Sequence, residues 1–124
     1  MTNIKTITPL HCHLFKKDVT EFEATTTQMD SIKEYPERQQ LDAHECRRAL
    51  LRCKACEQLY FYEFLEWIDW EDGNDPQYRK FIPVADERSA DALNDLSALE
   101  ITGIRPQLCV DWPADGDKQA YWLV

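Results

Sequence analysis

Two cysteines separated by two residues, Cys53 and Cys56, have the residue type and spacing best suited to chemistry in this sequence. The spacing lets both sulfurs approach one metal ion at about 2.3 Å, while backbone N–H groups of the tight turn donate hydrogen bonds to the thiolates. One such turn supplies two of the four ligands that a structural zinc ion takes. The sequence therefore predicts half of a zinc site here, and the other ligands must come from a second segment.

A cluster of donors near the N-terminus is the obvious source of those ligands. His11, Cys12 and His13 are consecutive in the chain. In an extended segment, residues 11 and 13 face one way and residue 12 faces the other. Either the two histidines act together, or Cys12 acts with one of them. We predict a metal site drawn from these three residues together with Cys53 and Cys56.

Other interpretations of these residues stay open at this point. His44-Glu45-Cys46 is a rival group of donors, and the chain has no second Cys-x-x-Cys. Glu57 follows Cys56, where a metal-binding turn usually has a glycine in the left-handed conformation. Cys53 and Cys56 could instead be ordinary thiols at a turn. A redox role is disfavoured, because it needs a helix N-terminus to depress the thiol pKa and a strand is expected to follow.

An acidic stretch between residues 63 and 75 is the second constellation, and it contains no Lys or Arg. Acidic groups around a tryptophan anchor are typical of a protein interface with steering charges. We therefore predict a partner-binding face formed by Trp67, Asp69, Trp70, Glu71, Asp72 and Asp75. The spacing does not match a calcium-binding EF-hand loop. Acid–base chemistry by paired carboxylates and a solvated strand edge with both tryptophans in the core are the alternatives.

The charge of the chain is placed unevenly along it. Residues 1–62 hold nine Lys/Arg and nine Asp/Glu, whereas residues 63–124 hold five and fourteen, which accounts for the formal net charge of −9. The second half should repel a phosphate backbone and attract a basic protein. The sequence has no glycine-rich phosphate loop and no nucleophile elbow. We expect a binding protein rather than an enzyme, with no direct contact to nucleic acid.

Composition sets further expectations about the compartment. No apolar run reaches about 18 residues, and the N-terminus lacks the apolar core of a signal peptide. Five cysteines are an odd number, and in a reducing compartment they favour metal ligands or core thiols over disulfides. We expect a cytoplasmic, monomeric protein without a membrane partner, with structural zinc as the one candidate cofactor.

The pattern of apolar residues predicts one α+β domain over residues 1–124, with an antiparallel sheet of about five strands and one or two packed helices. We expect a strand before Cys53, an aromatic strand after the Cys-x-x-Cys turn that can run on to Trp70, and a strand over residues 78–84. Residues 107–112 and 119–123 should form a hairpin around an Asp-Gly turn. The best helix covers residues 89–100, with Ser89 as its cap and an apolar stripe on one face. That stripe consists of Ala92, Leu93, Leu96 and Leu99.

The first 48 residues give weaker patterns. Residues 1–10 read as an extended strand, and residues 19–23 alternate as a short strand. Residues 24–34 are polar and are expected to form a loop or a frayed helix. Pro36 suits the first turn of a helix, so residues 36–48 are expected to be helical.

Residues 51–64 (LRCKACEQLYFYEF) and 69–78 (DWEDGNDPQY) resemble those of small bacterial proteins with one Cys-x-x-Cys before an aromatic strand. Such chains are similar in style to immunity proteins of toxin–immunity pairs, including those of contact-dependent growth inhibition. The resemblance covers residues 51–84 at most and carries over no catalytic residues. It implies an inhibitor that binds a cognate toxin, often a basic nuclease, and blocks its active site. The alternative is a zinc-ribbon-like adaptor that binds a different protein through its metal-binding turn.

Overall fold

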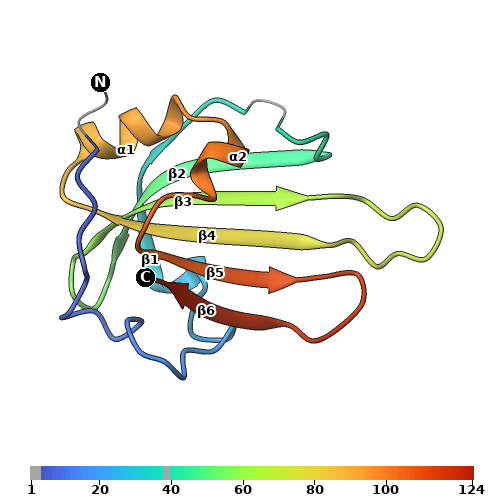
Figure 1. Ribbon diagram of the computed structural model, residues 1–124, viewed down its shortest axis with the longest axis horizontal. Coiled ribbons are helices and arrows are strands. Elements are labelled where there is room, and N and C mark those ends of the chain that lie inside the picture. Colours follow the sequence, from blue (N-terminus) through green and yellow to red (C-terminus); the bar gives the residue numbers. More distant parts are fainter. Residues whose placement is uncertain (1–3, 38–39) are drawn as a thin grey trace.

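The computed structural model describes residues 4–37 and 40–124. Its main feature is a six-stranded antiparallel sheet in which each strand pairs with the next one along the chain (Figure 1). The strands are β1 (Met29–Glu34), β2 (Glu45–Cys53), β3 (Leu59–Glu66), β4 (Gln77–Val84), β5 (Gln107–Trp112) and β6 (Gln119–Leu123). The predicted α+β class and antiparallel sheet are confirmed, with six strands in place of about five.

Both faces of the sheet are covered, and this explains the apolar run of residues 59–62 at the start of β3. Tyr60 and Tyr62 belong to the hydrophobic core on one face, and Phe61 belongs to the core on the other. Successive side chains of a strand point to opposite faces. A strand that is buried on both sides therefore carries apolar residues at successive positions, and the charged residue buried in β3, Glu63, is paired with Arg48. Tyr60 and Phe61 are both 0% exposed.

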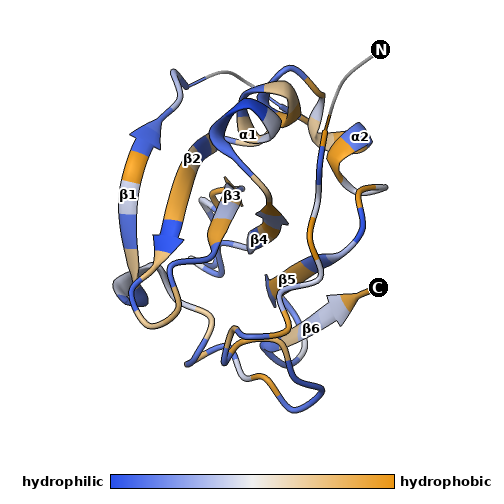
Figure 2. Ribbon diagram, turned by 90° about the vertical axis from the view of Figure 1, so that its left-hand side faces the viewer, coloured by the Kyte–Doolittle hydropathy of each residue, from blue (hydrophilic) through white to orange (hydrophobic). Residues whose placement is uncertain are grey.

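Two short helices cover one face of this curved sheet (Figure 2). Helix α1 (Glu87–Asn94) packs on β2, β3 and β4, and α2 (Ala98–Ile101) follows after a three-residue break. The helix expected over residues 89–100 is therefore divided. Among the described residues, neither helix has the length and apolar character needed to cross a membrane.

Capping chemistry explains the division. Asp86, not Ser89, caps α1, because the Asp86 carboxylate accepts a hydrogen bond from the Ser89 backbone N–H at 2.8 Å. Ser97 caps α2 in a reciprocal capping box with Glu100, and such a box starts a new helix rather than continuing an old one. Leu93 is fully buried as predicted, whereas Leu99 is 68% exposed because it lies in the separate second helix.

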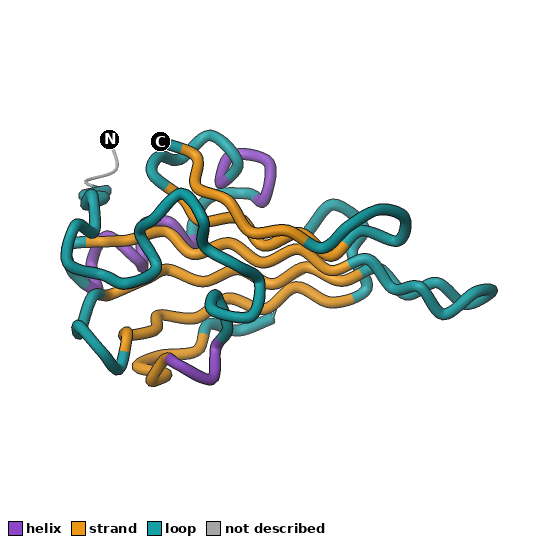
Figure 3. Tube along the Cα trace, turned by 90° about the horizontal axis from the view of Figure 1, so that it is seen from below, coloured by secondary structure: helices purple, strands orange, loops and turns teal. Residues whose placement is uncertain are grey.

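The N-terminal segment, residues 4–28, begins beside α1, where the Lys5 N–H donates to Ser89 Oγ, and then crosses to the opposite face of the sheet (Figure 3). Cys12, Leu14, Val19 and Ala24 insert into the core on that face. The predicted strand over residues 1–10 is reduced to an isolated bridge between Thr6 and Val84, and residues 1–3 lie outside the described part. Residues 19–23 do not form the expected strand, and residues 21–23 lie in turns.

Two other expectations for the first half need correction, although residues 24–28, with a 3-10 helix at Thr26–Gln28, fit the expected loop or frayed helix. Residues 24–34 contain β1, where Met29 is 6% exposed and pairs with Cys53. The helix expected over residues 36–48 is absent from its described positions, and β2 begins at Glu45. Leu41 and Asp42 have φ angles of 51° and 58°, which a right-handed helix excludes. Pairing with β1 and β3 outweighs the helix propensity of this segment; residues 38–39 lie outside the described chain.

Candidate metal centre

Three cysteines from two distant segments meet on the sheet face that the N-terminal segment covers. The sulfur atoms of Cys12, Cys53 and Cys56 all lie within 4.8 Å of one another. Cys12 Sγ is 4.0 Å from Cys53 Sγ. Tetrahedral zinc with sulfurs at about 2.3 Å needs sulfur–sulfur separations of about 3.8 Å. The thiols are therefore already close to the spacing at which one ion could bridge them.

The turn between β2 and β3 positions two of these sulfurs. Cys53 is the last residue of β2, and its carbonyl accepts a hydrogen bond from the Glu57 N–H at 2.8 Å. Glu57 has a φ of 66°, so it adopts the left-handed conformation although it is not glycine. Such a residue is strained by about 1–2 kcal/mol. The turn thus has the backbone shape of a metal-binding Cys-x-x-Cys without the usual glycine.

A second turn brings Cys12 to the site. The Cys12 N–H donates to the Pro9 carbonyl, and the Phe15 N–H donates to the Cys12 carbonyl, both at 3.0 Å. Because the chain turns here instead of running straight, Cys12 and His13 both approach Cys53. His13 Nδ1 is 4.0 Å from Cys53 Sγ. Of the combinations left open by the sequence, the structure brings together Cys12 and His13.

His13 is also held from its far side. Its Nε2 lies 3.1 Å from Oε1 of Gln28. A proton on Nε2, donated to this amide oxygen, leaves Nδ1 with a free lone pair directed towards Cys53. Histidines that bind metals usually donate their other N–H to a carbonyl or carboxylate in this way. Nothing in the sequence pattern singled out Gln28 for this position.

The surroundings of Cys12 and Cys53 shift the pKa values of these two thiols in opposite directions. Burial raises the pKa of Cys12 to about 12. Burial also disfavours the thiolate of Cys53, but hydrogen bonds from the backbone N–H groups of Cys56 and Ala55 outweigh it, so the pKa of Cys53 is lowered. These N–H groups are the donors that the Cys-x-x-Cys spacing was expected to supply. They favour the charged sulfur that a metal needs.

The buried side chain of Tyr60 lies next to the three cysteines of the cluster. It is 0% exposed, and its hydroxyl has no hydrogen-bond partner among the described residues. Burial raises its pKa, and the neighbouring Cys12 adds to that shift. A buried hydroxyl without a partner is costly, and a thiolate at Cys12 would satisfy it. The sequence showed Tyr60 only as one aromatic residue of a strand.

The other predicted donors lie elsewhere. His11 and His13 are both exposed, but His13 lies 4.0 Å from Cys53 Sγ, whereas His11 makes no hydrogen bond to a cysteine sulfur of the described chain. His44-Glu45-Cys46 stands at the opposite end of β2, where Cys46 packs with Ala43, Leu65 and Ala98. His44 Nδ1 accepts a hydrogen bond from the Ile68 N–H at 2.8 Å. Cys46 and Cys53 are seven positions apart along β2, or about 23 Å, so the rival group is not part of this centre.

The predicted partner-binding residues lie on the loop between β3 and β4, which extends beyond the ends of the neighbouring strands (Figures 1 and 3). Trp70 is 80% exposed there. Trp67, by contrast, packs against the small core around Cys46 and makes an edge contact with Tyr78 at 5.8 Å between ring centroids. Trp70 therefore faces solvent, and Trp67 anchors the base of the loop.

The acidic residues of this loop also fall into two groups: two bind the loop backbone and two face solvent. Asp69 Oδ1 accepts hydrogen bonds from the N–H groups of Glu71 and Asp72, both at 3.1 Å. Asp75 Oδ1 accepts from the Asp69 N–H at 2.7 Å. Asp69 and Asp75 thus build the turn, while Glu71 and Asp72 are exposed beside Trp70. Only these two carboxylates of the loop are fully available to another molecule.

Comparison with known proteins identifies no relative of the chain. No protein-family model matches it, and no curated protein and no solved structure matches it. The roles of the cysteine cluster and of the β3–β4 loop are therefore inferred from the chemistry of their residues.

Proposed function

We propose that this chain is a zinc-stabilised binding domain that acts in the cytoplasm as an immunity protein and occludes the active site of a basic, nuclease-type toxin. The observation that carries the binding role is Trp70, which is 80% exposed on the loop that extends beyond the sheet. Large aromatic residues are enriched among the residues that dominate binding energy at interfaces. Glu71 and Asp72 surround it with negative charge.

The proposed zinc ligands are Cys12, His13, Cys53 and Cys56. Three thiolates with one imidazole form a common structural zinc set, and thiolates select zinc over magnesium or calcium. Four protein ligands leave no open position for a substrate, so the proposed role is structural. The ion would fasten the N-terminal segment to the end of β2, and its binding free energy would add to the stability of the fold.

A basic partner suits the charge of the loop. Residues 63–75 contain no Lys or Arg, and the whole chain carries a net charge of −9. A nuclease must present basic residues to the phosphate backbone of its substrate. Such a surface would be attracted to the acidic loop during diffusion and could hold Trp70 at its centre. This complementarity supports a nuclease inhibitor over an inhibitor of an acidic enzyme.

The direct test is co-expression with the product of the neighbouring gene. We expect a stable complex of the two proteins, loss of the partner's nuclease activity on binding, and at least about tenfold weaker binding by Trp70→Ala, since a central tryptophan commonly contributes 2 kcal/mol or more. Leu99→Ala, which also removes an exposed apolar side chain but from α2, is the matched control. Absence of a complex at micromolar concentrations would overturn the proposal.

The second candidate is a zinc-ribbon-like adaptor, and one observation favours it. Leu10 is 73% exposed beside the cysteine cluster, and Lys54 and Ala55 are exposed at the tip of the Cys-x-x-Cys turn. A partner that docks here would lose affinity on Leu10→Ser and not on Trp70→Ala. The same pair of variants therefore separates the two functions.

A further inference from the structure

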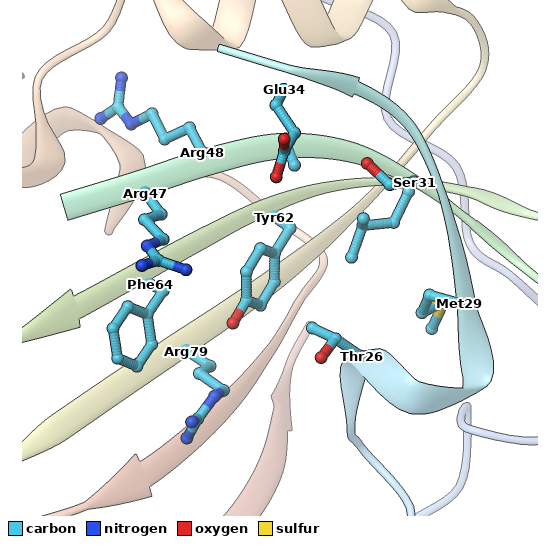
Figure 4. Close-up of a pocket in the computed structure, with 11 residues that line it drawn as sticks. Thr26, Met29, Ser31, Glu34, Arg47, Arg48, Tyr62, Phe64 and Arg79 are labelled. Atoms are coloured by element: carbon cyan, nitrogen blue, oxygen red, sulfur yellow. The ribbon is translucent and has the colours of Figure 1, made fainter. Parts of the chain in front are cut away.

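A half-open hollow of about 350 Å³ lies on the sheet face that carries the cysteines, but towards the other end of the strands (Figure 4). Tyr62, Phe64 and Arg79 line it from β3 and β4, and Arg47 lines it from β2. Thr26 borders it from the N-terminal segment. The volume is within the range of small-molecule sites.

Arg79 is held between two aromatic rings. Its Cζ lies 4.9 Å from the ring centroid of Phe64 on β3 and 4.9 Å from that of Trp112 on β5. Because β4 lies between β3 and β5 in the sheet, the rings flank the guanidinium. Lys118 Nζ lies 4.1 Å from the Trp112 ring and extends this row of cations and rings. The stacking fixes the Arg79 side chain and leaves the edge of its guanidinium to donate hydrogen bonds.

Arg79 has no carboxylate partner within 4.0 Å anywhere in residues 4–37 and 40–124, and its side chain donates hydrogen bonds to Gln77 Oε1 at 3.1 Å and to the Tyr62 hydroxyl. This is notable in a chain with 23 acidic and 14 basic residues. A guanidinium has five N–H donors. Most of the Arg79 donors are therefore available to a ligand.

Two hydroxyl donors accompany this cation. The Tyr62 hydroxyl points towards Thr26 and the stem of Arg79 (Figure 4). The Tyr62 hydroxyl accepts a hydrogen bond from Arg79, and among the described residues neither it nor the Thr26 hydroxyl donates to a protein acceptor. The negative groups nearby are at the rim: Glu34 lines the hollow, and Glu45 is already paired with Arg47 at 2.6 Å.

We propose that this hollow binds a small oxyanion, a carboxylate or a phosphate, with Arg79 as the charged contact and the hydroxyls of Tyr62 and Thr26 as further donors. A carboxylate or phosphate oxygen accepts in the plane of a guanidinium, and it accepts from hydroxyls as well. Such a ligand would supply the counter-ion that Arg79 lacks. The inference is independent of the zinc site and of the toxin partner.

The test is isothermal titration of the full chain with citrate, inorganic phosphate and AMP as separate probes. We expect at least one probe to bind saturably, with citrate marking a carboxylate ligand, phosphate and AMP together marking a bare phosphate, and AMP alone marking a nucleotide. Arg79→Lys keeps the charge but loses the planar fork, so affinity should fall about tenfold or more. Tyr62→Phe removes only the hydroxyl and should weaken binding severalfold.

Arg52→Gln is the matched control. Arg52 is an exposed arginine on the same strand as Arg47, 3.7 Å from Asp30 and outside the hollow, so its loss should change affinity by less than about twofold. If Arg79→Lys does not fold, the affinity of Tyr62→Phe for the probe is compared with that of Arg52→Gln instead. The proposal is overturned if no probe saturates below about 10 mM, an affinity too weak to be specific. It is also overturned if the folded variants of the hollow bind as tightly as Arg52→Gln.

Discussion

Arg48 and Glu63 form a buried ion pair directly across β2 and β3. Two guanidinium nitrogens of Arg48 donate to Glu63 Oε2 at 3.0 and 2.8 Å, and the side chains are 2% and 1% exposed. A third nitrogen of Arg48 donates to the carbonyls of Asn94 and Leu96 at the end of α1. Glu63, the first residue of the acidic stretch between residues 63 and 75, therefore connects the sheet to the end of α1 through Arg48.

Removing one member of this pair should be strongly destabilising. Arg48→Met leaves the Glu63 carboxylate buried without its partner, and we expect a loss of about 3–5 kcal/mol in the free energy of unfolding, measured by urea denaturation. Glu63 Oε1 already lacks a partner among the described residues, so the pair is imperfectly satisfied. The double variant Arg48→Met/Glu63→Leu should therefore recover most of the loss. A double variant as unstable as the single one would show that the charges themselves are required.

The helical stripe gives a second prediction about stability. Leu93 is 0% exposed and packs on the core of the helix-covered face, whereas Leu99 is 68% exposed. Leu93→Ala should cost about 2–5 kcal/mol, because it removes buried methyl groups and leaves a cavity. Leu99→Ala should cost less than about 0.5 kcal/mol. If Leu93→Ala and Leu99→Ala lowered stability equally in thermal denaturation, Leu99 would be buried in the core, as the continuous helix expected from the sequence requires.

A pH dependence is expected from Asp91 on α1. Its carboxylate accepts from Lys33 at 2.9 Å and from the Tyr35 hydroxyl at 2.7 Å, and these two contacts lower its pKa. A carboxyl group whose pKa is lower in the folded state stabilises the fold above its unfolded pKa of about 4. That stabilisation is lost as the pH falls through the folded pKa.

We therefore expect the melting temperature of Asp91→Asn to be lower than that of the wild type at pH 7, with the difference shrinking below pH of about 4. Asp95→Asn is the control, because Asp95 is exposed just after the same helix. A difference between wild type and Asp91→Asn that stays constant down to low pH would exclude the ionised carboxylate as its cause.

The β3–β4 loop should govern the rate of association with a partner. Glu71→Gln/Asp72→Asn removes two exposed charges and leaves the carboxylates of Asp69 and Asp75, which build the turn. We expect association to slow about tenfold at low salt, and much less at high salt, with unfolding unchanged within about 0.5 kcal/mol.

The matched control for this loop is Asp115→Asn/Asp117→Asn, which removes two exposed charges from the loop between β5 and β6. Stopped-flow association at two salt concentrations compares the two double variants. Equal rates and equal salt slopes for both would assign the electrostatic effect to the net charge of the chain and not to the β3–β4 loop.

Much of the sheet could be predicted from local patterns. The strands over residues 78–84, 107–112 and 119–123 lie where alternation and turn residues indicated, with β4 beginning one residue earlier. The strand after the Cys-x-x-Cys turn was also expected, although it ends at Glu66 and not at Trp70. In each case the turn chemistry is local, so neighbouring residues are enough to locate it.

The parts that could not be predicted depend on contacts between distant segments. Nothing local marks Met29 as the start of a strand, because its partner is Cys53. The sequence suggested that residues 11–13 could meet the Cys-x-x-Cys turn, but it could not choose among them. The choice depends on the turn at Cys12, on Gln28 beside His13 and on the buried Tyr60.

The metal content of the purified chain tests the central claim most directly. Native mass spectrometry of protein prepared without chelator should show one zinc ion per chain, and chelation should lower the melting temperature, because metal binding free energy becomes folding free energy. Cys56→Ser should lose the ion, while Cys109→Ser should retain it, since Cys109 is buried on β5 outside the cluster. A metal-free wild type, or a Cys56→Ser variant that binds zinc as the wild type does, would contradict the proposed site.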